Sequence, residues 1–152
     1  DEARASTDPR YLEQALRLNY VGCAFIAEEA TRRMPGGGVG AVITSVAGDR
    51  GKASNPAYGA SKAALAAHLS GLRQRLGPGP ITILDLRVGQ ADTPMTAQMK
   101  KGALFASAEV VGRGILAAIE ARKDVAYVPG RWRPLMRVIR EIPEPIFKRL
   151  KL

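Results

Sequence analysis

Short apolar runs alternate with longer segments of helical periodicity along this 152-residue chain. The apolar runs cover residues 39–46, 81–86 and 125–128, and such runs are typical of strands that are buried on both faces. Helical spacing occupies 8–35, 56–76 and the segment after Ser107. Because parallel strands need right-handed crossover helices, the alternation predicts an α/β fold: a doubly wound parallel sheet of three strands with helices on both faces.

The order of these segments also indicates how the chain is organised. It opens on a helix with no strand before it, and its first residues, DEARASTDP, contain no Met and resemble a loop that enters a helix. We therefore expect residues 1–130 to be the C-terminal part of a larger α/β domain. We expect residues 131–152 to form a basic amphipathic tail, because seven Lys or Arg residues there accompany two Glu residues.

Composition excludes some classes of protein and leaves others open. The lone Cys23 cannot form an internal disulfide, so we expect a reducing, cytoplasmic location. With one His and one Cys, no metal site is expected. The net charge of +9 suits nucleic acid, an acidic ligand or an anionic membrane surface, and composition alone does not choose among them. Nucleic acid is the weakest of these, because the basic residues are not interleaved with stacking aromatics.

Polar residues gather where the predicted strands end. Ser45 lies at the carboxyl end of the first strand, and residues 88–93 follow the second. Tyr58 and Lys62 stand in the first turns of the helix that begins after Asn55, which we expect to cap it, with Pro56 in its first turn. Ligands of open parallel sheets bind beyond the carboxyl ends of the strands, so these residues are expected to converge on one point.

The chemistry of that point follows from the residue types. Tyr58 and Lys62 are four residues apart and share one helix face. A neighbouring cation favours the phenolate form of a tyrosine, so Tyr58 could exchange a proton with a carbonyl or alcohol oxygen. The hydroxyl of Ser45 could hold that oxygen in place. A Tyr–Lys pair at this spacing is by itself usually only a solvated pair, and the prediction depends on the whole group.

This group of residues resembles the active-site signature of the short-chain dehydrogenases/reductases. Ser45, Tyr58 and Lys62, within YGASK, match its central motif, and Asn19 in RLNYVG matches its fourth catalytic position. The resemblance implies a Rossmann-like fold and an NAD(P)-dependent oxidoreductase acting on a small carbonyl or alcohol substrate. It also implies that Tyr58 is the acid/base, Lys62 binds the nicotinamide ribose, Ser45 polarises the substrate oxygen and Asn19 supports a relay water.

The segment RVGQADTPM is similar to the nicotinamide-contacting loop of the same family, with Val88 in place of the usual proline. This likeness adds Gly89, Ala91 and Thr93 to Tyr58 and Lys62 as cofactor-binding residues, although Thr93 could equally be only the N-cap of a short helix. The family's glycine-rich phosphate turn and Asn-Asn-Ala-Gly segment do not occur in the chain. We therefore expect these residues alone to be inactive, and the choice between NAD and NADP stays open.

A narrower resemblance links SVAGDRGKASNPAYGASK and the closing YVPGRWRPLMRVIREIPEPIFKRLKL to decaprenylphosphoryl 2-keto-ribose reductases. It implies a keto sugar on a lipid carrier as substrate. The apolar face of the tail could lie on a membrane surface or close over the substrate pocket. Arg50, beside Asp49, could touch a substrate phosphate, but a solvated loop pair is the simpler expectation.

Two further expectations concern assembly and the absence of activity. Small residues along the helix 56–76 allow a close helix–helix approach; this serves either packing on the chain's own sheet or, as the family resemblance implies, a homodimer or homotetramer. The alternative to an enzyme is a non-enzymatic truncated remnant, or a basic membrane or interaction domain, in which the Ser–Tyr–Lys group is idle. The position of the start codon would separate these hypotheses.

Overall fold

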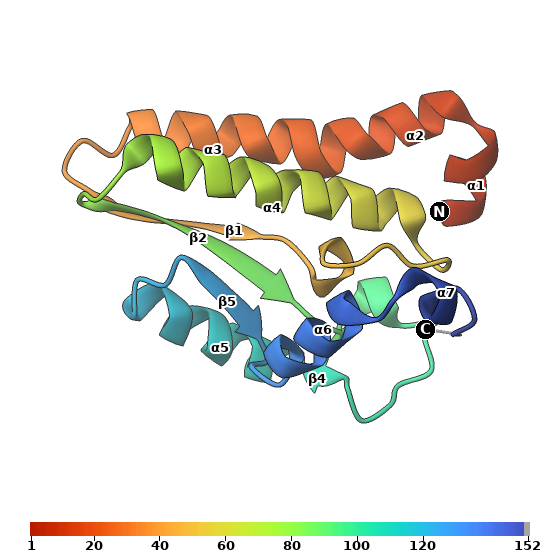
Figure 1. Cartoon of the computed structure of the whole chain (residues 1–152). Helices are drawn as coiled ribbons and strands as arrows, with labels where there is room; N and C mark the ends of the chain where they lie inside the picture. Colours follow the sequence, from red (N-terminus) through yellow and green to blue (C-terminus); the bar gives the residue numbers. More distant parts are fainter. Residues whose placement is uncertain (151–152) are drawn as a thin grey trace.

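The fold is described by a computed structural model that covers residues 1–150, so the last two residues of the predicted tail lie outside the described part. A three-stranded parallel sheet lies at its centre in the order β1-β2-β5. The strands are β1 (Gly38–Ile43), β2 (Ile81–Val88) and β5 (Val125–Val128). This arrangement confirms the predicted α/β class with a parallel sheet and helices on both faces (Figure 1).

Helices cover the two faces of this sheet. On one face lie α2 (Pro9–Leu16), the π-helical turn η1 (Arg17–Gly22), α3 (Cys23–Arg32) and α4 (Pro56–Leu76). On the other face lies α5 (Ala108–Glu120), which Ser107 caps by accepting a hydrogen bond from the Val110 amide (Figure 1). Each face has its own apolar core, with Leu65 and Leu69 under α4 and Leu84 and Leu86 under α5.

Three boundaries differ from those predicted. The first residues form a helix, α1 (Glu2–Thr7), because the Asp1 carboxylate caps it by accepting from the Arg4 amide. The helix expected from Asp8 onward contains the turn η1, so it is not regular throughout. The first strand ends at Ile43, since the hydroxyl of Ser45 accepts from the Ala47 amide and starts the 3₁₀ turn η2 (Val46–Gly48).

The segment between β2 and α5 was predicted as a long loop, and it contains additional short elements. A two-residue strand, β3 (Ala91–Asp92), pairs in parallel with β4 (Ala106–Ser107), and the 3₁₀ turn η3 (Pro94–Thr96) lies between them. Two-residue strands carry no periodicity that a sequence pattern could reveal.

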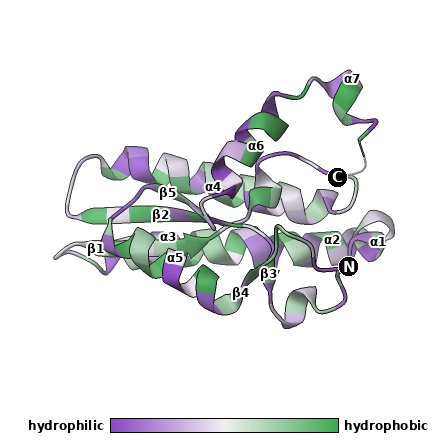
Figure 2. Cartoon of the chain, turned by 90° about the horizontal axis from the view of Figure 1, so that it is seen from below, coloured by the Kyte–Doolittle hydropathy of each residue, from purple (hydrophilic) through white to green (hydrophobic). Residues whose placement is uncertain are grey.

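The C-terminal segment lies at the end of the sheet where the strands finish. It contains α6 (Trp132–Glu141) and the short helix α7 (Glu144–Phe147). Figure 2 shows hydrophilic and hydrophobic residues side by side along α6. Its apolar face is turned inward, because Trp132 and Met136 are buried against Val46 of the turn η2.

Candidate active site

Tyr58 and Lys62 lie together in the first turns of α4. The Lys62 ammonium is 5.8 Å from the centre of the Tyr58 ring, and it donates a hydrogen bond of 3.1 Å to the carbonyl of Ile43, the last residue of β1. The helix therefore places the Lys62 ammonium at the carboxyl end of β1, with the Tyr58 ring beside it on the same helix face.

Lys62 is a buried cation. Only 9% of the residue is exposed, and this burial lowers the pKa of the ammonium, while the neighbouring Cys23 acts in the opposite direction. An ammonium has three N–H donors, and the structure uses one of them on Ile43. Among the described residues the ammonium makes no second hydrogen bond, so two donors are left that could bind hydroxyl groups such as those of a sugar.

Ser45 reaches the same corner through the turn η2. Its hydroxyl accepts from the Ala47 amide at 3.1 Å and donates to the carbonyl of Val88 at 3.4 Å. A β-carbon on Gly59, the residue after Tyr58, would lie 2.9 Å from the carbonyl oxygen of Ala47. The turn that carries Ser45 therefore packs directly on the first turn of α4, and only glycine allows this approach.

Asn19 lies within the π-helical turn η1, and its amide donates to the carbonyl of Ala15 at 3.1 Å. It lines a cavity of about 280 Å³ together with Tyr58, Tyr11 and Glu2. Single π turns inside helices often occur at functional sites, because they re-aim one side chain. Asn19 and Tyr58 thus face one space although 39 positions separate them in the sequence.

The first turn of α4 is capped by a residue that the sequence did not point to. Asn55, the predicted cap, makes no side-chain capping bond, and its amide oxygen is buried without a partner. The carboxylate of Glu2 accepts instead from the amides of Ala57 at 3.1 Å and Tyr58 at 2.9 Å. Asn55 therefore holds the predicted N-cap position, with Pro56 in the first turn, but its side chain does not make the expected bond. The contact from Glu2 spans at least 55 positions and leaves no local signal.

The loop after β2 supplies the other predicted cofactor-binding residues. The indole of Trp132 covers Gly89 so closely that a β-carbon there would lie 1.9 Å from Nε1. Ala91 belongs to β3, and Thr93 precedes η3, with its amide donating to the Thr96 hydroxyl at 3.2 Å. Their binding of a cofactor stays a prediction, and Gly89 also has a packing role with the tail.

Four charged or hydroxyl side chains form a largely buried hydrogen-bonded group next to the turn that carries Ser45. Asp49 accepts from Arg87 and from the hydroxyl of Tyr127, both at 2.7 Å, and Arg87 also donates to Asp85 at 3.0 Å. The expectation of a solvated Asp49–Arg50 pair is therefore wrong, because Asp49 turns into the protein and finds its partners there. A sequence signal existed in Asp85, a charged residue in the middle of the apolar run ILDLRV.

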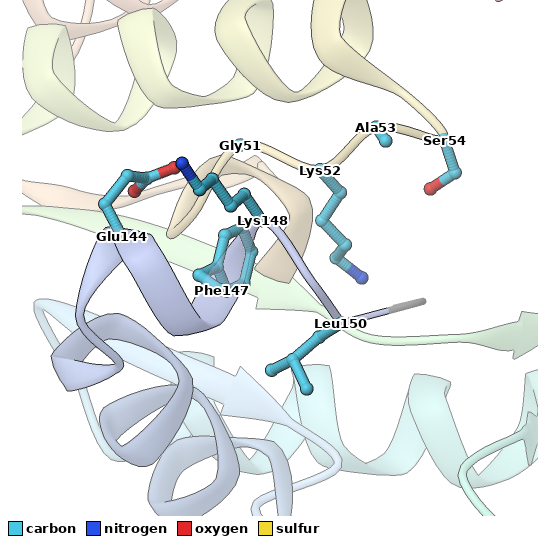
Figure 3. Close-up of a pocket in the computed structure, with 8 residues that line it drawn as sticks. All are labelled: Gly51, Lys52, Ala53, Ser54, Glu144, Phe147, Lys148 and Leu150. Carbon is cyan, nitrogen blue, oxygen red and sulfur yellow. The ribbon is translucent and has the colours of Figure 1, made fainter.

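A groove of about 780 Å³ separates the loop before α4 from the end of the chain (Figure 3). It is lined by Gly51, Lys52, Ala53, Ser54, Glu144, Phe147, Lys148 and Leu150. Arg50 holds its outer wall: it donates to Glu144 at 2.6 Å and to the carbonyl of Arg140 at 2.9 Å, and it stacks 4.2 Å from the centre of the Phe147 ring.

The described residues contain neither a cluster of metal ligands nor a membrane-spanning helix. Within residues 1–150, no group of three His, Cys, Asp or Glu side chains is arranged to hold a metal ion. Across the same range, every helix is too short or too polar to span a bilayer.

Comparison with known proteins assigns the chain to a family. The sequence profile described as short chain dehydrogenase matches residues 1–103. An uncharacterized oxidoreductase of Mycobacterium tuberculosis is 30% identical over 99% of this chain and 61% of its own length. An uncharacterized oxidoreductase of Streptomyces coelicolor is 29% identical over 99% of this chain and 60% of its own length.

One solved structure shows the same fold. It is a short chain dehydrogenase from Burkholderia cenocepacia in complex with NADP, which superposes with a TM-score of 0.82 at 20% identity. The match covers 96% of this chain and 61% of that one. The chain thus spans about 61% of the length of the proteins it matches.

Proposed function

Because this chain belongs to the short chain dehydrogenase family of oxidoreductases, we propose that it carries the acid–base part of an NAD(P)-dependent reductase. The reaction is hydride transfer between nicotinamide and a carbonyl or secondary alcohol. One observation carries the proposal: the Lys62 ammonium lies 5.8 Å from the Tyr58 ring centre and is bonded to the end of the strand that leads into Ser45.

Each residue then has a distinct task. A bound NAD or NADP supplies or accepts the hydride, and Lys62, Gly89, Ala91 and Thr93 are the residues that would hold its nicotinamide end. Tyr58 gives its hydroxyl proton to the carbonyl oxygen as the carbon is reduced. The two donors of Lys62 that are not used on Ile43 bind ribose hydroxyls, and its positive charge stabilises the phenolate that Tyr58 leaves behind.

Two side chains support this transfer. The Ser45 hydroxyl donates to the same substrate oxygen, so it must exchange its contact with the Val88 carbonyl for the substrate. Asn19 lies on the cavity that Tyr58 lines, where it can hold a water that returns the proton to Tyr58.

The direct test is Tyr58→Phe, which removes one oxygen and keeps the ring. We expect kcat for ketone reduction to fall by about 10²–10⁴-fold, with the midpoint of thermal unfolding unchanged. Oxidation of NADH and NADPH with a panel of ketones is measured on the 152-residue chain and on any longer product that its gene encodes. Turnover that survives in Tyr58→Phe contradicts the assignment.

The competing hypothesis is a non-enzymatic remnant or a basic interaction domain. It is favoured if the start codon lies near Asp1 and neither nucleotide binds. Reading the gene upstream of Asp1 and titrating the chain with NADH and NADPH separate the two hypotheses.

For the substrate, we propose a carbonyl compound with an anionic and an apolar part, such as a keto sugar on a lipid phosphate. The groove next to α4 supports this, since its lining combines two lysines, Lys52 and Lys148, with the apolar Phe147 and Leu150. In Figure 3, Lys52 reaches over the groove and Lys148 points toward Glu144. Neither lysine is ion-paired within residues 1–150. Ser54 of the groove is four residues from Tyr58, so their α-carbons are at most about 15 Å apart.

This proposal is tested with soluble probes. Octyl phosphate below its micelle concentration should bind the chain at least about tenfold more tightly than octyl glucoside or inorganic phosphate. Lys52→Ala with Lys148→Ala should remove the preference, and Lys123→Ala, an exposed lysine at the other end of the molecule, should keep it. Binding only to phosphatidylglycerol vesicles would instead favour the membrane role of the tail.

For assembly, we propose a homodimer or homotetramer formed through the helix face of η1 and α3. Four apolar side chains there are more than half exposed: Leu18, Val21, Phe25 and Ile26. Exposed patches of this kind mark interaction sites. Light scattering should show an oligomer that Phe25→Glu dissociates, and a monomeric wild type would exclude this role.

A further inference from the structure

A connected set of hydrogen bonds and ion pairs holds the turn that carries Ser45 at both of its ends, Thr44 and Asp49. At the near end, the hydroxyl of Thr44 donates to the carboxylate of Asp85. At the far end, Asp49 accepts from Arg87 at 2.7 Å. Arg87 closes the circuit by donating to Asp85 at 3.0 Å. The path runs from Thr44 through Asp85 and Arg87 to Asp49, and we call these four residues the clamp.

The clamp is an interior structure and not a surface ion pair. The side chain of Asp85 is 0% exposed, that of Asp49 is 3% exposed and that of Arg87 is 18% exposed. Burial alone would lower the pKa of Arg87, but its hydrogen bond to Asp85 and the charges of Asp85 and Asp49 raise it, which keeps the guanidinium charged. Contacts of this kind are strong and rigid because water does not compete for them.

Tyr127 of β5 fixes the far end of the turn a second time. Its hydroxyl donates to the second oxygen of Asp49 at 2.7 Å and accepts from Arg87 at 2.9 Å. Burial and the hydrogen bond to Asp49 raise the pKa of Tyr127, so the phenol stays a donor at neutral pH. The clamp therefore ties η2 to β2, and Tyr127 ties it to β5 as well.

Ser45 itself makes only light contacts. Its hydroxyl donates to Val88 at 3.4 Å, a long hydrogen bond, and accepts from the amide of Ala47, which lies inside the same turn. These two contacts are too weak to fix the direction of the hydroxyl. Its direction therefore depends on the backbone conformation of residues 44–49. That backbone is held in place by the side chains of the clamp.

We propose that Arg87 is a positioning residue for Ser45: by bridging Asp85 and Asp49 it sets the turn that aims the serine hydroxyl at the substrate oxygen. The inference rests on the proposed function for the role of Ser45. An arginine is needed because its planar fork reaches two carboxylates at once from fixed directions, whereas a lysine presents a single point charge.

The test compares Arg87→Lys with Arg73→Lys in the whole chain. Arg73 is a matched control, because it also bonds across to β2, donating to the carbonyl of Ile83 at 3.2 Å, but far from Ser45. Amide hydrogen exchange at Ala47 reports the Ser45 contact directly, and exchange at the core residue Leu84 reports global opening. Ser45→Ala sets the exchange rate that Ala47 shows when the contact is absent.

In Arg87→Lys we expect Ala47 to exchange at least about tenfold faster, approaching the rate in Ser45→Ala, with Leu84 changed much less. In the reductase assay, kcat should fall about tenfold or more while KM stays within about twofold, because Ser45 acts on the reacting oxygen. Arg73→Lys should move neither quantity. Tyr127→Phe, which removes one of the two contacts to Asp49, should give a smaller change in the same direction.

Unchanged exchange at Ala47 in both Arg87→Lys and Tyr127→Phe overturns the proposal. Equal acceleration at Ala47 and Leu84 also overturns it, because the clamp would then act only on overall stability. Hydrogen exchange needs no turnover, so a chain without reductase activity still tests whether Arg87 holds the turn. Conversely, a failed clamp leaves the Tyr58→Phe test of the proposed function intact.

Discussion

Asp49 and Arg50 are neighbours in the chain, yet their side chains belong to opposite regions of the molecule. Asp49 turns inward, is 3% exposed and bonds to Arg87 and Tyr127. Arg50 faces the C-terminal segment, where its own side chain is 19% exposed, and pairs with Glu144, whose side chain is 74% exposed. The first contact belongs to the clamp behind Ser45, and the second fastens the C-terminal segment that walls the groove (Figure 3).

The comparison teaches that burial, more than distance, decides what an ion pair is worth. The two contacts have similar lengths, 2.7 Å for Arg87–Asp49 and 2.6 Å for Arg50–Glu144. Water screens the outer pair, so its net contribution is small. In the clamp, removal of one partner leaves a charge in a medium that cannot solvate it. The interior contact therefore fixes geometry, while the exterior contact can open at little cost.

The largest effect should come from Asp85→Ala, which removes the fully buried member of the clamp. Arg87 keeps Asp49 and Tyr127, and Thr44 keeps the carbonyl of Leu86, but each loses a bond to a buried carboxylate. The expected loss of unfolding free energy is about 3 kcal/mol. Urea unfolding followed by circular dichroism measures it. Asp92→Ala is the control, because Asp92 is exposed and its ion pair with Lys101 lies at the surface; it should change stability by less than about 0.5 kcal/mol. Equal effects of the two variants would remove the contrast between interior and surface.

Gly89→Ala tests whether the start of α6 is packed as tightly as the protein interior. The new methyl group would meet the buried Trp132 indole at 1.9 Å, so the start of α6 must shift, at a cost of about 1–3 kcal/mol. Gly102→Ala is the matched control, because a β-carbon added at Gly102 would have no atom of the described residues within 4 Å. Thermal unfolding of the two variants checks the prediction, and similar midpoints would place the Trp132 end of α6 outside the interior.

Lys62 is a third case, a buried cation that bonds a carbonyl and, within the described structure, has no carboxylate partner. The variant Lys62→Met tests what its burial costs. Replacement by an apolar side chain of similar length should raise the unfolding free energy by about 1 kcal/mol at neutral pH and weaken nucleotide binding. Denaturant unfolding and nucleotide titration measure the two effects. A destabilised Lys62→Met would show that the carbonyl of Ile43 fully compensates the burial of the charge.

The same variant has a pH dependence of known sign. Burial lowers the pKa of Lys62 below its ordinary value of 10.5, so as the pH rises the folded state loses this proton before the unfolded state does. Between its lowered pKa and 10.5 the unfolded state binds more protons, and the stability of the wild type rises with pH. The advantage of Lys62→Met should therefore shrink as the pH is raised through this alkaline range. A constant difference would contradict the lowered pKa.

The smallest effect should come from Arg50→Ala on the outer side of the loop. We expect a loss of about 1 kcal/mol or less, because Glu144 is solvated and the Phe147 contact is partly exposed. Limited proteolysis should instead show faster cleavage between α6 and α7. In the wild type, molar salt should also speed this cleavage, because it screens the Arg50–Glu144 pair, and it should leave the hydrogen bonds of the clamp intact. A loss of unfolding free energy as large as that of Asp85→Ala would show that the Arg50 contacts belong to the protein core.

Local patterns predicted most of the secondary structure. The strands at 81–86 and 125–128, the helix 56–76 with its end before Gly77 and the Ser107 cap are all present, because each depends on residues close in sequence. The first helical residues were missed, since DEARAST has no apolar periodicity and is held by the Asp1 cap. The carboxylate of Glu2 at the amides of Ala57 and Tyr58 was missed because it joins segments 55 positions apart.

The sequence by itself determined the alternation of helix and strand, and with it the edge of the sheet where the turn of Ser45 packs on the first turns of α4. Periodicity and the handedness of crossovers suffice for that. Only the tertiary structure decided which way Asp49 and Arg50 face and that Trp132 covers Gly89. It also decided that Arg87 joins Asp85 to Asp49. These contacts depend on the relative placement of strands and on exclusion of water, which no local pattern encodes.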